Sequence, residues 1–409
     1  MKSDVSVLAE NSRSFQPVLQ TGSVEMGIPA RWLRSRTWDS FWLLSGFWIP
    51  TLLLLLPIDS IKPLTVVVTL LFWMGHRISS LYLGFCVGEY REVLQARRHY
   101  FLSFPLFLLC LLAGFLLAPE SVIPLSLLRR FVLLAFLDYF LSLYHFSVQH
   151  YGVLSVYRGR LPHGQKDPGL LRWDWWVCIG VSGIFSIAMD YLNGEFDPYE
   201  IFGNAPLLSE SAMNGLRLGL TALVVVAWVL TLRKYVQKQQ GIARILYLST
   251  LCYLTIVSFY LEPLLYFFVV QAQHWFVSLG LTTHMAANSR FEPRQQSHKP
   301  WYRPWAWINA RAFGPLLVLV LLSIGLTPLL EADYFIVHSF DTEALTVQGV
   351  LVHLQDSAWI YVLGGLAMFS SFLHYIYDRG VFRLSDPLTR KAALPLLIPL
   401  GQRMRIKRG

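Results

Sequence analysis

Residues 141–158, LSLYHFSVQHYGVLSVYR, combine an apolar helical run with two histidines, His145 and His150. An imidazole at membrane depth is costly unless it has a partner, so two of them in one apolar run favour a functional site. Three later stretches carry a histidine in a similar setting: His274 in QAQHW, His284 in TTHMAAN and His374 in LHYIYD. If these histidines meet, the chain holds a membrane-embedded metal site; if they do not, it is a helical membrane protein of another kind.

The composition is that of a polytopic membrane protein. Hydrophobic residues make up 55% of the chain and charged residues only 14%, with a mean hydropathy of +0.47. Soluble domains carry about 25% charged residues, so a soluble globular chain is excluded. The net charge of +9 indicates basic loops beside anionic lipid, and we expect no nucleic-acid partner. The four cysteines form no CxxC pair and predict neither a disulfide framework nor a cysteine metal site.

Apolar stretches of about 20 residues, the length that crosses a bilayer as a helix, recur along the chain. We predict an all-α, polytopic bundle of about ten transmembrane helices, with a cytoplasmic tail at 1–39 and a basic cytoplasmic cap at 379–409. The transmembrane domain, 40–378, would hold helices at about 40–57, 63–86, 100–118, 131–155, 173–192, 214–232, 244–260, 264–288, 312–330 and 357–378.

The charges of the loops give these helices a direction. Lys and Arg gather in the tail, in the loops after the second, fourth, sixth and eighth helices, and in the cap, whereas the intervening loops are short or acidic. Because basic loops stay in the cytoplasm, this alternation predicts that both termini are cytoplasmic. We expect a multi-pass protein of the bacterial inner membrane, with its intramembrane histidines biased toward the cytoplasmic half.

Seven side chains of the even-numbered helices are candidate metal ligands: His76, His145, His150, His274, His284, His374 and Asp378. Imidazole and carboxylate are the ligands of non-haem iron, mononuclear or di-iron, and they also suit zinc or copper. His374 and Asp378 are four residues apart and share a helix face, so the carboxylate can bind the ion or orient the imidazole. His145 and His150 lie about 140° apart around a regular helix, so one ion can take both only if a π-bulge distorts the helix.

Three polar residues are candidates for handling the substrate: Arg77, Gln149 and Asn288. Arg77, inside an apolar helix, can pair with Asp138 or bind the carboxylate or phosphate of an amphipathic substrate. Snorkelling of this arginine toward the cytoplasm is the alternative. The other two each lie one turn from a histidine and share its face. Any of these histidines, taken alone, can also do no more than hydrogen-bond to a neighbouring helix.

Single histidines on several helices, meeting near one membrane face, resemble two families of integral-membrane non-haem iron enzymes. One is the di-iron desaturases and hydroxylases, and the other is the bacterial membrane-integral carotene-cleaving dioxygenases. The HxxxH and HxxHH boxes of the first are absent, and His145 and His150 are spaced one residue wider than the one-turn pair of the second. The phrases QHYGVLSVYR and LHYIYDRGVFRLSDP are similar to bacterial polytopic membrane proteins with histidine motifs. The resemblance implies an iron oxygenase in general terms and no specific activity.

We therefore expect an integral-membrane oxidoreductase. Histidine-bound iron in the cytoplasmic half of the bundle would activate O₂ toward a lipid-soluble substrate, a fatty acyl chain or an isoprenoid, with an electron-transfer partner. Two other functions stay open. Ionisable residues in membrane helices also mark proton-coupled or small-molecule transporters, although no internal repeat is visible. A membrane acyl- or glycosyltransferase would need only one of the histidines, as a general base.

Overall fold

The computed structural model describes residues 32–159, 167–192, 208–261, 263–289, 302–311, 313–330 and 358–397. Within these ranges the chain forms helices joined by turns, with no strand, which confirms the all-α prediction. Most of the predicted tail, and the cap beyond residue 397, lie outside the described residues. The helices are α1 (Arg36–Trp42), α2 (Ser45–Leu55), α3 (Ile58–Cys86), α4 (Arg91–Ala96), α5 (Phe104–Leu117), α6 (Leu127–Gly159), α7 (Pro168–Ile179), α8 (Phe185–Leu192), α9 (Glu210–Gln237), α10 (Ile242–Ser258), α11 (Pro263–Ala287), α12 (Tyr302–Asn309), α13 (Gly314–Leu330), α16 (Ala358–Phe382) and α17 (Pro387–Leu397).

Several of these helices have the length and apolarity of membrane spans. Four qualify among the described residues: His99–Leu117, Arg129–Gly159, Pro168–Ala188 and Glu210–Gln237. The number rises to six if each of two bent pairs is one span, Arg36–Trp42 with Ser45–Leu55 and Val67–Cys86 with Gly88–Ala96. The apolar helices indicate a membrane protein. A helix occupies each of the ten apolar stretches of the sequence, but ten spans and cytoplasmic termini stay predictions.

Helix α9 illustrates why the outer surface of the bundle suits lipid. Its first turn is capped by Ser209, whose hydroxyl accepts the N–H of Ala212. Beyond that turn, large apolar side chains face outward on several sides: Leu216, Leu218, Leu223, Val225, Val226, Val229 and Leu230. A helix that faces water would carry polar side chains there, so the exposed apolar surface fits a hydrocarbon environment.

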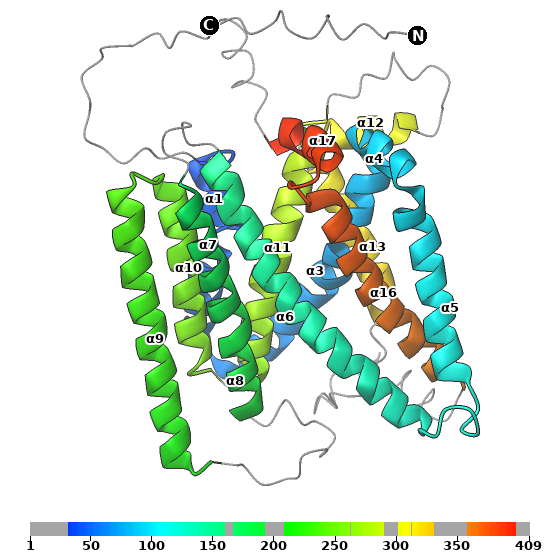
Figure 1. Ribbon diagram of the computed structural model, residues 1–409, viewed down its shortest axis with the longest axis horizontal. Coiled ribbons are helices and arrows are strands. Elements are labelled where there is room, and N and C mark those ends of the chain that lie inside the picture. Colours follow the sequence, from blue (N-terminus) through cyan, green and yellow to red (C-terminus); the bar gives the residue numbers. More distant parts are fainter. Residues whose placement is uncertain are drawn as a thin grey trace, which may run out of the picture.

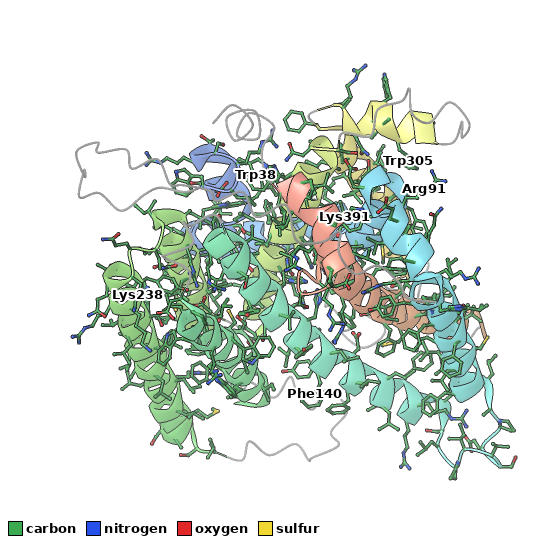
Figure 2. All side chains as sticks on the ribbon, turned by 45° about the horizontal axis from the view of Figure 1, so that its top comes forward. Trp38, Arg91, Phe140, Lys238, Trp305 and Lys391 are labelled. Carbon is green, nitrogen blue, oxygen red and sulfur yellow. The ribbon has the colours of Figure 1, made fainter. Side chains whose placement is uncertain are left out.

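Short helices gather at one end of the bundle, where Figure 1 shows α1, α4, α12 and α17. Figure 2 labels Arg91, Trp305 and Lys391 at this end. Helix α17 is tied to α4 and the turn after it. Asp386 forms an ion pair with Arg97, and Lys391 lies 2.8 Å from Glu92. The segment after α16 is therefore an ordered cap on this end of the bundle.

Helix α3 crosses the middle of the bundle and packs against α11, α13 and α16 (Figure 1). The contact with α13 is close, because a Cβ placed on Gly75 would lie 2.8 Å from the backbone oxygen of Leu319. Only glycine fits at this position without a shift of one of the two backbones. The next residue is His76, so this close approach fixes the height and rotation of one candidate ligand.

Helix α6 runs diagonally across the bundle and packs against α7 and α16 (Figure 1). Its start is anchored by the buried Arg130, which donates to the backbone oxygens of Phe115 and Leu116 at the end of α5. A cation is favourable there because the carbonyls at a helix C-terminus carry partial negative charge. The helix is regular throughout 141–158; the π-helical turns of the described chain are at His99–Ser103 and Gly180–Ile184. His145 and His150 therefore point to different neighbours.

Candidate metal centre

Four of the predicted ligands meet inside the bundle and are named here the four-histidine group: His76 on α3, His145 on α6, His274 on α11 and His374 on α16. Each offers one ring nitrogen, and these nitrogens lie within 4.8 Å of one another. Three of the rings are buried, and that of His145 is partly buried. Because one ligand comes from each of four helices, only their tertiary packing creates the group.

The four rings form a closed cycle in which each ring lies beside two others. His76 lies 4.4 Å from His274 and 4.3 Å from His374, measured between ring centroids. On the other side, His145 lies 4.9 Å from His274 and 4.8 Å from His374, whereas the diagonal from His76 to His145 is 6.4 Å. Interplanar angles of 73–87° along the four edges set each ring edge-on to its neighbours. Rings placed in this way can direct their nitrogens toward one common point.

A backbone carbonyl orients His374. Its Nδ1 lies 3.1 Å from the backbone oxygen of Arg77. A carbonyl can only accept, so Nδ1 must carry the proton and Nε2 keeps its lone pair for the interior of the group. Second bonds of this kind fix the tautomer and the ring orientation of metal-binding histidines.

Several ring nitrogens of the group lack a protein hydrogen-bond partner. Both nitrogens of His274 and Nδ1 of His76 are buried without one. The Nε2 atoms of His145 and His374 lie 3.2 Å apart, and because Nε2 of His374 has no proton, it accepts the hydrogen bond from His145. Burying unpaired polar atoms is unfavourable, and buried polar groups are otherwise bonded to protein or water. A cation that accepts these lone pairs would satisfy the arrangement, so the residues fit a bound metal ion.

Asp378 lies at the edge of the four-histidine group. Its Oδ2 is 3.4 Å from Nε2 of His145, and its Oδ1 is 3.5 Å from Nδ1 of His374, one turn earlier on α16. Ser80, on α3, lies beside the carboxylate. As predicted from the four-residue spacing, the carboxylate and His374 share a face. Asp378 is thus placed to balance the charge of an ion or to complete its coordination.

The structure does not bring His150 into the group. Its Nδ1 lies 2.8 Å from the hydroxyl of Tyr247 on α10. The preceding residue, Gln149, donates to the backbone oxygen of His274 over 3.3 Å. The physical reason for the separation is the regular geometry of α6, which turns His150 about 140° away from His145. Gln149 contacts the group only through a backbone atom.

His284 and Asn288 also lie apart from the group, near the cap. Nε2 of His284 is 3.3 Å from the backbone oxygen of Leu397, and the Asn288 amide donates to the backbone oxygen of Leu396 over 2.7 Å. The two side chains contact each other at 3.2 Å. Both therefore satisfy the carbonyls that end α17, which is a way of docking that helix.

Arg77 points away from the centre of the group. Its Nη1 donates to Ser370 over 3.0 Å, and its guanidinium lies 5.4 Å from the ring centroid of Trp73. Asp138 interacts electrostatically with this arginine, as the sequence suggested, and it accepts hydrogen bonds from Ser371 and Tyr375. A charged and hydrogen-bonded patch therefore borders the four-histidine group on the α6 and α16 side.

Sequence reasoning did not select Ser371, Tyr375 and Tyr247. The first two belong to a polar face of α16 that repeats every three to four residues and also carries His374 and Asp378, so helical spacing would have found them. Tyr247 has no such signal, because its partner lies 97 positions earlier in the chain.

Comparison with known proteins does not assign the four-histidine group to a family. No protein-family model, curated protein or solved structure gives a significant match to the chain. What the four-histidine group does must therefore be inferred from its own chemistry.

Proposed function

We propose that the chain is an integral-membrane oxidoreductase in which the four-histidine group binds an iron ion beside a lipid-soluble substrate. One observation carries the proposal: four ring nitrogens from four helices lie within 4.8 Å of one another inside an apolar bundle. Imidazole is a ligand of iron, zinc and copper, and oxidation chemistry requires one of the redox-active ions.

The size of the group favours one ion over two. Imidazole nitrogens bind such ions at about 2.0–2.1 Å, so two nitrogens on one ion are at most about 4.2 Å apart. Side-chain shifts of about half an ångström would bring the four-histidine group to that size. Asp378 is the one carboxylate within 3.5 Å of the group among the described residues, whereas di-iron carboxylate sites draw on several carboxylates. The mononuclear form of the iron hypothesis is therefore preferred.

The protein's own residues would prepare the site. Bound iron supplies the capacity to activate O₂. The backbone oxygen of Arg77 holds His374 with its lone pair inward, and Asp378 offsets the charge of an ion held by four neutral imidazoles. Helix packing around Gly75 keeps His76 in register, so the ligands need no large rearrangement to converge.

The partial exposure of one member of the group supports a lipid-soluble substrate. His145 is the one partly buried member, and its helix presents a stripe of exposed apolar side chains at helical spacing: Leu133, Leu137, Phe140 and Tyr144. Figure 2 shows Phe140 on this outer side of α6. Fatty acyl chains and isoprenoids dissolve in hydrocarbon, so they would reach the group beside this stripe without crossing water.

Metal analysis of the purified protein tests the proposal. We expect about one iron per chain after reconstitution with Fe(II) under anaerobic conditions, and loss of that iron in His274→Ala and His374→Ala. His99→Ala is the matched control, because His99 is exposed and pairs only with Ser103. His150→Ala should keep its iron, since His150 lies outside the group.

Two further readouts test the oxidation chemistry. Nitric oxide should give an EPR signal with the Fe(II) protein if a coordination position is open for O₂. Oxygen consumption on adding membrane lipid extracts should require both iron and the four-histidine group. A well-folded protein that binds no metal would overturn the proposal, and so would tight zinc binding without oxygen consumption.

A further inference from the structure

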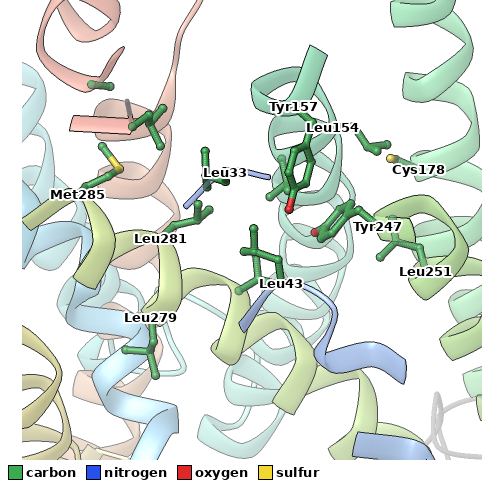
Figure 3. Close-up of a cluster of buried hydrophobic side chains, with 14 of the residues drawn as sticks. Leu33, Leu43, Leu154, Tyr157, Cys178, Tyr247, Leu251, Leu279, Leu281 and Met285 are labelled. Carbon is green, nitrogen blue, oxygen red and sulfur yellow. The ribbon is translucent and has the colours of Figure 1, made fainter. Parts of the chain in front are cut away.

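A file of buried polar side chains leads from the four-histidine group toward α1. On α6, His150 and Tyr157 follow His145 by about 7.5 and 18 Å along the helix axis. His150 Nδ1 contacts the Tyr247 hydroxyl at 2.8 Å. The hydroxyls of Tyr157 and Tyr247 point toward one another in Figure 3, and their ring centroids are 6.0 Å apart.

The far end of this row of polar side chains lies close to exposed residues. Tyr157 donates to the carboxylate of Asp39 over 2.8 Å, and the same carboxylate accepts the backbone N–H groups of Leu33 and Arg34. Asp39 itself is buried, but residues 34–37 are exposed. They lie at the end of the bundle that carries α1, α4, α12 and α17 (Figure 1). We name the side chains of His150, Tyr247, Tyr157 and Asp39 the polar file.

Between the polar file and the four-histidine group, buried polar atoms have no protein partner. The Gln149 amide nitrogen bonds the backbone of His274, while its side-chain oxygen has no partner. Both ring nitrogens of His274 are also unpartnered. Buried atoms of this kind are normally bonded to ordered water.

Helix α10 contributes one more such atom. The hydroxyl of Thr250, one turn from Tyr247, is fully buried and unpartnered. A Cβ on Gly46 would meet the side chains of both Thr250 and Gln273, at 2.6 and 3.2 Å, so these two side chains lie close together. The unpartnered hydroxyl therefore lies beside the side chain of Gln273, the residue before His274, and fits bound water there.

We propose that the polar file, joined to the four-histidine group by water at Gln149 and Thr250, is a proton path from the aqueous end at α1. Imidazole and hydroxyl groups both donate and accept protons. The His150–Tyr247 and Tyr157–Asp39 steps are hydrogen bonds, and between them the hydroxyls of Tyr247 and Tyr157 point toward one another. The inference rests on the proposed function, since protons are needed at the group when oxygen is reduced there.

A proton path also distinguishes between classes of oxidation reaction, because only some of them consume protons. Removing two hydrogens from a saturated chain gives RCH₂CH₂R′ + O₂ + 2 e⁻ + 2 H⁺ → RCH=CHR′ + 2 H₂O. Hydroxylation, RH + O₂ + 2 e⁻ + 2 H⁺ → ROH + H₂O, has the same requirement. In both, the substrate supplies two electrons, a one-electron donor protein supplies the other two, and two protons come from water. A dioxygenation that puts both oxygen atoms into the product needs neither, so a working path points to desaturation or hydroxylation.

Proton uptake by the iron-loaded protein tests the path. The Fe(II) protein is mixed with O₂, membrane lipid extract and a one-electron reductant whose oxidation releases no proton, in weakly buffered detergent solution. A pH indicator follows the protons taken up. Tyr247→Phe removes the hydroxyl between His150 and Tyr157, so we expect uptake to slow at least tenfold with unchanged iron content. Thr250→Val, which keeps the shape and removes the water ligand, should slow it as well.

A tyrosine on the same helix provides the control. Tyr253 bonds Thr51 at 2.9 Å and lies outside the polar file, so Tyr253→Phe should take up protons at the wild-type rate. Slowing in Tyr247→Phe together with a larger D₂O effect supports the path. Iron-loaded Tyr247→Phe and Thr250→Val proteins with wild-type uptake overturn it while the proposed function stands. A wild-type protein without iron overturns the proposed function itself.

Discussion

Two of the buried polar clusters in this bundle differ in how their members are paired. Between α7, α9 and α10, Asp174 binds Arg244 and accepts a 2.5 Å hydrogen bond from Tyr235, while Arg244 also donates to Gln240. In the four-histidine group, by contrast, Nδ1 of His76 and both ring nitrogens of His274 are buried without a hydrogen-bond partner. The first cluster pairs its charged groups with each other and joins helices, although Nε of Arg244 has no hydrogen-bond partner. The second cluster has unpartnered ring nitrogens that a ligand would satisfy, which is why we assign function to it.

The largest effect that tests this contrast is on stability. Asp174→Ala would leave the fully buried Arg244 without its carboxylate, and breaking a buried pair costs about 3–5 kcal/mol. Denaturant unfolding of the detergent-solubilised protein measures the loss. Replacing both partners, Asp174→Leu with Arg244→Met, should restore most of it because no unpaired charge remains. Lys238→Ala, which breaks an exposed pair with Asp167, should change little. A stable Asp174→Ala variant would contradict the structural role.

Substitution in the four-histidine group should affect metal binding strongly and the stability of the metal-free protein little, the opposite of the result expected for Asp174. His274→Ala is expected to weaken metal binding by more than about 100-fold, since the loss even of an outer-shell partner costs about 10–100-fold. The metal-free variant should nevertheless be as stable as the metal-free wild type or more so, because the substitution removes a buried imidazole with two unpartnered nitrogens. Titration with metal and unfolding of the metal-free protein separate the two effects. A large loss of stability without metal would show that the ring is a packing residue.

Helix packing behind the group should have an intermediate effect. In Gly75→Ala the new methyl group would meet the backbone oxygen of Leu319, so α13 must move, at a cost of about 1–3 kcal/mol. The shift would also displace His76 and weaken metal binding. Gly114→Ala on α5 is the control, because its Cβ meets nothing and alanine is the better helix former. Equal metal affinity in Gly75→Ala and wild type would show that the close approach does not position the ligand.

Part of the four-histidine group was visible in the sequence, because it depends on periodicity. Apolar length located the helices, and the depth set by loop charges placed His76, His145, His274 and His374 where they could converge. Which histidines face the same point was not visible, since that depends on the rotation of each helix in the bundle. His150 illustrates this: helical spacing showed that it and His145 face different ways, but not which of them faces the other three helices.

Which polar groups pair within each cluster was even less visible in the sequence. Asp174, Arg244 and Tyr235 are 61 to 70 positions apart where they pair, and no short motif connects them. The role of His284 and Asn288 also depends on α17, which folds back onto α11 from more than 100 positions later. Contacts between distant helices follow from packing of whole surfaces, which single-sequence spacing does not encode.

The smallest expected effect concerns a third polar cluster, at the aqueous end. The Thr389 N–H, and the Arg97 guanidinium with it, hold the pKa of Asp386 below its ordinary value. A depressed pKa in the folded state stabilises the protein above the unfolded value of about 3.9, and this contribution disappears as the pH falls below it through the folded pKa. Protection of the α17 amides in hydrogen exchange should therefore fall below about pH 4, before the transmembrane helices are affected.

Two substitutions of Asp386 separate its role as the N-cap of α17 from the effect of its charge. Asp386→Ala removes both and should cost about 1 kcal/mol, the usual value of an N-cap. Asp386→Asn keeps an acceptor for the Thr389 N–H and loses only the attraction to Arg97, so it should cost less and abolish the acid dependence of α17 protection. Metal binding should be unchanged in both, because Asp386 belongs to neither the four-histidine group nor the polar file. A change in metal affinity would mean that α17 and the four-histidine group are energetically coupled. Pairing within one cluster would then not isolate it from its neighbours.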